Sequence, residues 1–317
     1  MRAYKPHGTL AAVNPAWLVA LFSILAIALL GTLLFRPTAG RGGKPEGEIV
    51  VFCAAGIKPP VEATAKDYER EYGIPIQLQY GGSGTLLNNL RVSRSGDLYI
   101  AADESYIRLA REQGLIAETM PLAHQHPVIA VRKGNPKGVR SLDDLTREGV
   151  AVALANPEAA SIGKLVKTAL EKIDRWKPLE AHAKVFKPTV NDVANDVKLG
   201  SADAGIIWDA TLSQYPELVA VEVPELAPHV ETVTAAVLQS SKQAPAALRF
   251  ARYLAARDKG IGKFVAMGYA PADGDAWAEA PEIVLFSGAM LRPGIEKTLK
   301  EFEAREGCRI KIGRAHV

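Results

Sequence analysis

A glycine-rich turn contains the first residues that could do chemistry. Residues 81–85 (GGSGT) follow the alternating stretch 74–80, which is typical of a half-buried strand, and precede leucines at helical spacing. A glycine turn that leads into a helix capped by Ser83 aims backbone N–H groups and a hydroxyl at one point. This arrangement suits an anion, although an ordinary helix cap has the same sequence pattern.

A second stretch of the same chemical character follows the first strand. Residues 49–52 (IVVF) are apolar on both faces, which is typical of a buried parallel strand. The small residues 54–56 come next, and then a helix that is started by proline and closed by Gly73. In open α/β sheets, this junction of strand, tight turn and helix N-terminus is where ligands bind and where amides favour an anion.

Other polar residues do not support a catalytic centre. His124 and His126 invite a metal site, but two histidines at i, i+2 without a third ligand are more typical of solvent-facing or hinge positions. Asp203 and Asp209 show no paired carboxylate, so they receive no acid–base role. The sequence contains no Walker loop, nucleophile elbow or HExxH helix. We therefore predict a protein that is not an enzyme, with no cofactor and no directly ligated metal.

Length and composition limit the number of domains but do not identify the partner. At 317 residues and 48% hydrophobic, the chain can bury the cores of about two domains. The net charge of +3 is small and the basic residues are scattered, which argues against nucleic acid as a partner. Cys53 and Cys308 occupy non-equivalent places and indicate no disulfide framework.

The N-terminal region predicts a membrane helix. Residues 16–35 contain no charged side chain, and their length matches a hydrocarbon core of about 30 Å. Arg36 follows directly, without a good Ala-x-Ala site, which favours an uncleaved anchor over a cleaved signal peptide. Residues 38–47 (TAGRGGKPEG) are typical of a flexible linker. We therefore predict a membrane anchor and linker over residues 1–46.

The strand–helix unit at residue 48 occurs twice in the sequence. Residues 48–76 match residues 282–310 without a gap, at an offset of 282 − 48 = 234, which indicates a duplication. Such a fragment cannot bury its own apolar face, so we expect it to be disordered or packed on a neighbour. Residues 312–317 (IGRAHV) match the translation of a string that resembles a sequencing-library adapter, and we expect a non-native tail there.

The remaining pattern predicts two lobes. Beyond Pro121 the chain crosses into a second lobe, with strands expected at 128–131, 150–154, 184–187 and 204–208. The extended stretch 231–238 then returns to the first lobe. Lobe 1 is therefore expected to be discontinuous, over residues 47–123 and 231–276, with lobe 2 (residues 124–230) inserted within it.

These motifs together resemble a known family. The segments VFCAAG, QYGGSGTL, GDLYIAAD, ANPEAASIGKLVKTAL, NDVANDVKLGSADAGIIW and ALRFARYL stand in the order and spacing of the periplasmic molybdate-binding proteins of ABC importers, over residues 48–270. The resemblance implies an α/β fold of two hinged lobes, each a mostly parallel sheet flanked by helices. It also implies a protein on the periplasmic side of the inner membrane that delivers an oxyanion to an importer permease. Residues 277–311 would then start a truncated second repeat of the binding protein.

The resemblance also implies five ligand-binding positions. Gly56 stands where the family commonly has a serine, so only its amide could serve, whereas Ser83 matches and offers its hydroxyl and its amide. Ile162 and Val193 match by place and would act through backbone N–H groups at helix N-termini. Trp208 replaces the family's tyrosine, and its indole N–H is a donor only, although a strand-end tryptophan is also typical of core near a hinge.

Two classes of function remain open from the sequence. The first is a membrane-tethered receptor for a tetrahedral oxyanion, with molybdate or tungstate favoured. The second is an anion sensor or scaffold module with a degenerate site, which the tandem copies and Gly56 favour. Sulfate and phosphate differ from molybdate mainly in size and protonation, and the sequence does not choose among them.

Overall fold

The computed structural model describes residues 47–306 and 308–314. The expected membrane anchor at residues 16–35 and the end of the expected tail, 315–317, lie outside the described residues. Among the residues that are described, no helix is both long and apolar enough to cross a membrane.

A six-stranded sheet forms the core of the first lobe. Its strand order is β11-β4-β10-β3-β1-β2, with β1 parallel to β2 and β3, and with β10 antiparallel to β3 and β4. The strands span β1 (Ile49–Ala54), β2 (Ile76–Gly81), β3 (Leu98–Ala101), β4 (Ile116–Gln125), β10 (Glu231–Leu238) and β11 (Ala270–Pro271).

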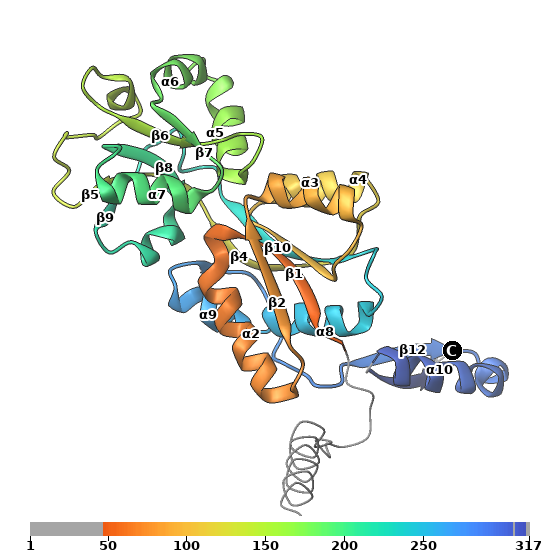
Figure 1. The fold of residues 1–317 in the computed structure, drawn as a ribbon. Coiled ribbons are helices and arrows are strands. Elements are labelled where there is room, and N and C mark those ends of the chain that lie inside the picture. Colours follow the sequence, from red (N-terminus) through yellow and green to blue (C-terminus); the bar gives the residue numbers. More distant parts are fainter. Residues whose placement is uncertain (1–46, 307, 315–317) are drawn as a thin grey trace, which may run out of the picture. The chain divides into compact units, whose positions relative to one another are not determined.

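Helices cover both faces of this sheet (Figure 1). One face carries α2 (Lys58–Tyr72), α8 (Ala244–Leu254) and α9 (Gly260–Ala266), and the other carries α3 (Ser83–Ser93) and α4 (Glu104–Glu112). Because side chains alternate along a strand, Val51 of β1 packs in the cluster with α2, α8 and α9, whereas Phe52 packs with α3 and α4. This two-sided burial explains why β1 is apolar at consecutive positions.

A five-stranded sheet forms the core of the second lobe. Its order is β7-β6-β8-β5-β9, with β6 parallel to β7 and β8, and β5 antiparallel to β8 and β9. Helices α5 (Ser161–Glu171), α6 (Trp176–His182) and α7 (Val190–Leu199) accompany it. The strands span β5 (Pro127–Arg132), β6 (Val152–Ala155), β7 (Val185–Lys187), β8 (Ala204–Trp208) and β9 (Leu218–Val221).

The predicted fold class, a two-lobed α/β architecture with helices flanking each sheet, is confirmed. The sheets are more mixed than expected, because the chain leaves the first lobe along β4, enters the second along β5 and returns along β10, and each of these strands has antiparallel neighbours. Strand β4 was not expected, since the sequence placed the crossing at Pro121. In the structure β4 continues to Gln125, and the pairing with β10 is irregular between Val233 and Thr234, opposite Leu122.

The C-terminal unit forms the same arrangement as the first strand–helix–strand unit. It consists of β12 (Glu282–Ser287), η4 (Ala289–Leu291), α10 (Arg292–Glu306) and β13 (Arg309–Arg314). Ile283 pairs with Ile310 as Ile49 pairs with Ile76, at the same offset. These matched pairings support the duplication that the sequence indicates.

The C-terminal unit also leaves apolar surface open. On β12, Val284 and Phe286 are 53% and 69% exposed, and Leu291 in η4 is 64% exposed. Apolar side chains at the corresponding places of the first unit, such as Val50, Phe52 and Ile57, pack in its cores.

Candidate functional site

A small cleft between the two sheets is bordered by the N-terminal ends of four helical segments. They are η1 (Ala55–Ile57), which continues into α2, together with α3, α5 and α7. The cavity measures about 10 Å³, which is room for about one water-sized sphere. Its lining consists of Ala54, Ala55, Gly56, Gly81, Gly82, Ser83, Ala102, Ala160, Ser161, Ile162, Thr189, Val190 and Trp208.

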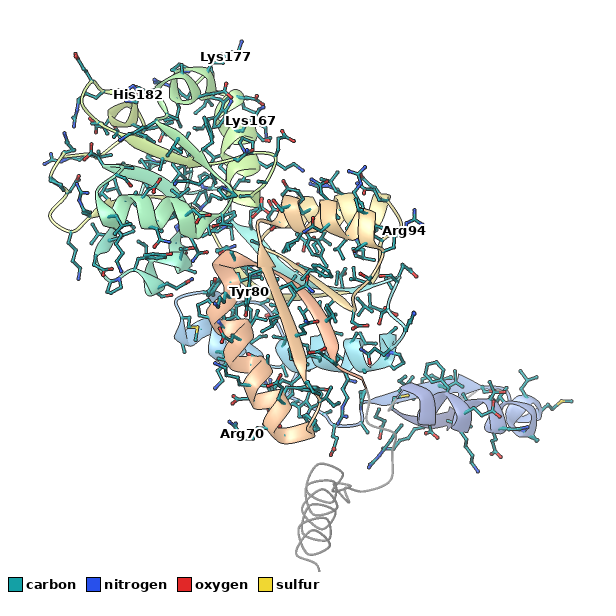
Figure 2. The ribbon with its side chains drawn as sticks, viewed as in Figure 1. Arg70, Tyr80, Arg94, Lys167, Lys177 and His182 are labelled. Atoms are coloured by element: carbon teal, nitrogen blue, oxygen red, sulfur yellow. The ribbon has the colours of Figure 1, made fainter. Side chains whose placement is uncertain are left out.

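The electrostatics of this cleft come from the backbone. In the described part of the chain, no charged side chain is among its lining residues. Exposed cations such as Arg94 and Lys177 lie on the outer surface instead (Figure 2). Each helix N-terminus carries about half a positive charge and N–H groups without intrahelical partners. Four such ends at one point make the cleft electropositive without any formal charge.

The start of each helix decides which amides face the cleft. No side chain caps α5, and its first intrahelical bond runs from the Lys164 N–H to the Ala160 carbonyl, which leaves the Ser161 and Ile162 amides to the cleft. Helix α7 is capped by Thr189, whose Oγ1 accepts from the Asp192 N–H at 3.2 Å. The amide of Val190, its first residue, is left to the cleft in the same way.

Ser83 is held as a donor at the start of α3. It is only 1% exposed, and its Oγ accepts a hydrogen bond from the Ala102 N–H at 3.3 Å. Its carbonyl accepts from the Tyr99 hydroxyl at 2.8 Å, which fixes the turn. Because the Ser83 Oγ already accepts, its own proton remains available to a group in the cleft.

Gly56 has a steric reason to lack a side chain. A β-carbon at this position would lie 2.8 Å from Cγ1 of Val190, inside van der Waals contact. The Gly56 carbonyl is also unusual, because Pro59 and Pro60, the residues that would donate to it in a helix, have no N–H. It accepts instead from the side chains of Gln214, at 2.8 Å, and Tyr269, at 3.0 Å.

The two lobes also touch at the start of α3. The Gly84 and Thr85 N–H groups of α3 donate to the Ala159 carbonyl of the second lobe at 2.9 and 3.3 Å. A β-carbon on Gly84 would lie 2.4 Å from the Glu158 carbonyl, and one on Gly82 would lie 2.3 Å from that of Ala159. The glycines of the GGSGT turn therefore allow backbone-to-backbone approach of the lobes.

Four of the five positions expected from the sequence line this cleft: Gly56, Ser83, Ile162 and Trp208. Val193 does not. It is fully buried one turn into α7, and its N–H donates to the Thr189 carbonyl at 3.3 Å. The Val193 amide is therefore engaged within its own helix, and Val190 lines the cleft instead.

The lining also includes residues that the sequence reasoning missed, namely Ser161, Thr189 and Val190. The capping pattern of Thr189 and Asp192 does indicate that a helix opens there, but the resemblance placed the ligand position further along this helix, at Val193. Trp208 is 1% exposed in the core of the second lobe and also lines the cleft, while its role as a donor to a ligand stays a prediction.

The two histidines lie near the crossing between the lobes. His126 Nδ1 is 3.0 Å from Asp209 Oδ2, and its Nε2 is 3.3 Å from the Glu222 carboxylate. His124 Nδ1 is 3.1 Å from the Thr232 hydroxyl. Within the described residues, no group of three histidine, cysteine or carboxylate side chains could hold a metal ion. The histidines are thus hydrogen-bonding residues of the hinge region.

The pKa values of two carboxyl groups, those of Glu231 and Asp103, are raised. Burial, together with the negative charge of Asp103, raises the pKa of Glu231, the first residue of β10, to about 7. Burial also raises the pKa of Asp103 itself, although the N–H of Tyr106 opposes this shift. Both groups lie outside the lining of the cleft.

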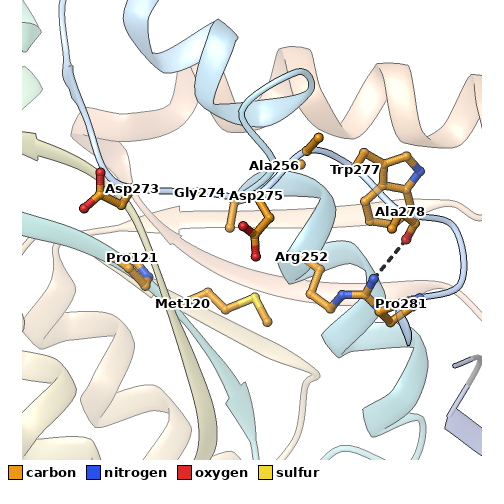
Figure 3. Close-up of a pocket in the computed structure, with 12 residues that line it drawn as sticks. Met120, Pro121, Arg252, Ala256, Asp273, Gly274, Asp275, Trp277, Ala278 and Pro281 are labelled. Carbon is orange, nitrogen blue, oxygen red and sulfur yellow. Dashed lines mark hydrogen bonds between the residues drawn. The ribbon is translucent and has the colours of Figure 1, made fainter. Parts of the chain in front are cut away.

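A larger cavity, of about 340 Å³, lies elsewhere, between β4, the end of α8 and residues 273–281 (Figure 3). Asp273 and Asp275 line it, and the Arg252 guanidinium there donates to the Ala278 carbonyl at 2.9 Å. None of the positions expected from the sequence is part of this cavity. Two carboxylates beside one engaged arginine would repel an oxyanion, so its size does not make it the anion site.

Comparison with known proteins gives a consistent result. A family profile described as "Bacterial extracellular solute-binding protein" matches residues 49–270. The chain is 28% identical over 219 residues to the "Molybdate-binding protein ModA" of Mycobacterium tuberculosis, which covers 68% of this chain and 82% of that relative.

Solved structures agree on the fold. The periplasmic molybdate-binding protein of Azotobacter vinelandii aligns with a TM-score of 0.60 and 16% identity, over 71% of this chain and all (100%) of that one. The sulfate-binding protein SubI of Mycobacterium tuberculosis aligns with a TM-score of 0.64 and 19% identity, over 83% and 96% of the two chains. At these identities the structural likeness shows the fold alone.

Proposed function

The chain belongs to the bacterial extracellular solute-binding protein family, and on that premise we propose that its cleft captures a tetrahedral oxyanion, molybdate or tungstate first, for an ABC importer. Proteins of this kind bind solutes for transport and are not enzymes. The observation that carries the proposal is the meeting of four helix N-termini at a cleft whose lining, among the described residues, has no charged side chain. The ModA relative supports molybdate as the first candidate.

The donors of the cleft match a dianion. A charged ligand taken out of water needs many hydrogen bonds, and amides at helix ends supply them without a counter-charge. We assign the donors to the amides of Gly56, Ser83, Ile162 and Val190 and to the hydroxyl of Ser83, with the Trp208 indole N–H as a further group. Bonds to a charged group contribute about 1.5–3 kcal/mol each. Losing one of them should weaken the site without abolishing it.

The absence of carboxylates from the described lining bears on the choice of anion. Molybdate, tungstate and sulfate are dianions without a proton at neutral pH, whereas phosphate retains a proton that needs an acceptor. We therefore expect phosphate to bind most weakly. The cavity of about 10 Å³ favours a compact ligand, which makes sulfate the second candidate. Either anion has five atoms, so binding requires the lobes to stand slightly further apart.

The partners and location follow from the same proposal. The loaded protein would dock on an importer permease at the extracytoplasmic face of the membrane. The apolar stretch at residues 16–35 would tether it there. Extraction of membranes from expressing cells checks the tether, because a protein anchored by a helix stays with the membrane at high salt and is released by detergent.

Calorimetric titration of the protein with molybdate, tungstate, sulfate and phosphate tests the function. We expect molybdate and tungstate to bind, and Ser83→Ala to weaken them about 10-fold or more, the effect of one charge-assisted bond. Ser93→Ala is the matched control, since Ser93 is exposed at the other end of the same helix. Binding of none of the four anions would contradict the proposal and favour a sensor or scaffold module with a degenerate site.

A further inference from the structure

Thr211 carries a buried hydroxyl without a hydrogen-bond partner. The residue lies in η3 (Asp209–Gln214), the turn that follows β8, and is 0% exposed. Within the described residues, its Oγ1 makes no hydrogen bond. An unpaired buried hydroxyl destabilises a fold, so a group of this kind calls for an explanation.

The position of the Thr211 hydroxyl suggests an explanation for its lack of a partner. Thr211 Oγ1 lies 3.9 Å from the point where a β-carbon on Gly56 would stand, and Trp208 Cδ1 lies at the same distance from that point. Both Gly56 and Trp208 line the cleft. The Thr211 hydroxyl therefore lies beside the corner of the cleft that is bounded by the Gly56 loop and the end of β8.

This corner is also where a hydroxyl donor is missing. A serine at position 56 would bring one, but Cγ1 of Val190 occupies the space that its β-carbon needs. Threonine at position 211 places a hydroxyl close to the same point from the opposite lobe. A tetrahedral oxyanion presents four acceptor oxygens, and it is the kind of ligand that the unpaired donor lacks.

The η3 turn is well fixed relative to the Gly56 loop. Gln214, at its end, donates to the Gly56 carbonyl, and Ala210 packs in the core of the first lobe. Asn191, next to Val190, donates to the Gln214 side chain at 3.1 Å. The turn thus connects three walls of the cleft, so the Thr211 hydroxyl keeps its place beside Gly56 when the lobes are closed.

We propose that Thr211 is a further ligand-binding residue, whose hydroxyl donates to an oxygen of the bound oxyanion in place of a side chain at position 56. The inference rests on the proposed function and deepens it, because it names a residue that determines affinity for the oxyanion. It also explains why a glycine at position 56 is compatible with a working site.

The test replaces the hydroxyl by a methyl group of nearly equal size. Thr211→Val should weaken molybdate binding in calorimetric titration by about 10-fold or more, and Thr211→Ser should retain it. The melting temperature of ligand-free Thr211→Val should stay level or rise, because an unpaired hydroxyl contributes no bond to the fold. If Thr211 were only structural, the valine variant would instead have a lower melting temperature and an unchanged affinity for molybdate.

Thr64→Val is the matched control. Thr64 is also 0% exposed, but its Oγ1 donates to the Pro60 carbonyl at 2.7 Å, away from the lining of the cleft. This variant should lower the melting temperature and leave oxyanion affinity unchanged. The two valine variants therefore separate ligand contact from structural bonding.

The outcomes distinguish the role of Thr211 from the proposed oxyanion-binding function. If the wild type binds and Ser83→Ala weakens binding while Thr211→Val does not, the inference fails and the proposed function stands. A melting temperature of ligand-free Thr211→Val several degrees below that of the wild type would also overturn it, since the hydroxyl would then have a structural partner. If the wild type binds no oxyanion, the proposed function itself fails.

Discussion

The side-chain amide of Gln214 donates a 2.8 Å hydrogen bond to the carbonyl of Gly56, from the second lobe to the loop that follows β1 in the first. The two residues are 158 positions apart in the chain. The bond exists because the double proline at 59–60 leaves the Gly56 carbonyl without a helical donor. Because the bond joins the two lobes, we expect it to favour the closed state of the cleft.

Replacing Gln214 by methionine should therefore weaken ligand binding. The methionine has a similar length but cannot donate, and the loss of one neutral bond of about 0.5–1.5 kcal/mol predicts a 2- to 10-fold lower affinity, with faster dissociation. Stopped-flow and calorimetric titration with molybdate measure both. Gln77→Met, on the exposed side of β2, should change neither. An unchanged dissociation rate in Gln214→Met would show that this bond does not hold the lobes together.

Gly84→Ala should prevent full closure of the lobes. Its β-carbon would lie 2.4 Å from the Glu158 carbonyl and 3.1 Å from the Ala159 carbonyl, and these backbone groups have little room to move away. Helix α3 itself should not suffer, since alanine favours a helix. We expect at least a 100-fold loss of affinity, and a radius of gyration in X-ray scattering that no longer falls on adding molybdate. Gly262→Ala, whose β-carbon would have its nearest neighbour at 3.8 Å, should behave as wild type.

Glu231 should make stability depend on pH. Its pKa is about 7 in the fold, against 4.5 as the ordinary value. Unfolding therefore releases a proton between these values, so this residue's contribution to stability falls as pH rises from about 4.5 to about 7, and the loss persists above. Glu231→Gln removes this loss. We expect the variant to gain on the order of 1 kcal/mol relative to wild type at pH 8, a value kept small because water still reaches the carboxylate.

Urea unfolding of both proteins at pH 4 and pH 8 measures this difference. At pH 4 the carboxyl group is protonated in the fold and mostly protonated in the unfolded chain, so the two proteins should be nearly equal. Glu225→Gln, at an exposed position nearby in the chain, should show no gain at pH 8. A gain of Glu231→Gln that is equal at both pH values would point to a cause other than ionisation.

The sequence located the elements whose signals are local. The apolar run 49–52 identified β1, because a strand buried on both faces must be apolar at every position. The GGSGT turn identified the start of α3, because glycines favour such a turn whatever surrounds them. The expected cap was wrong, since Gly82 is the N-cap, no side chain caps the helix, and Ser83 is its first residue. The motif order along the chain identified the two-lobed fold and four positions of the cleft.

Two elements had no such local signal. Strand β4 contains Pro121 and does not alternate cleanly, and it is stabilised by its pairing with β10, more than a hundred residues further along the chain. Helix α6 has seven residues with a proline at its third position, too short a pattern to indicate a helix. Both elements depend on contacts that are remote in the sequence.

The composition of the cleft was decided by the tertiary structure. Only the tertiary structure shows that Val190, in the first turn of α7, lines the cleft, and that the Val193 N–H is bonded to the Thr189 carbonyl instead. Only packing shows that Val190 fills the space beside Gly56 and that Thr211 places a hydroxyl there. The sequence determined which segments can present helix amides, because that property is local. Which side chains meet at the point between them depends on how the lobes close, and distances across the cleft leave no periodic signal in the chain.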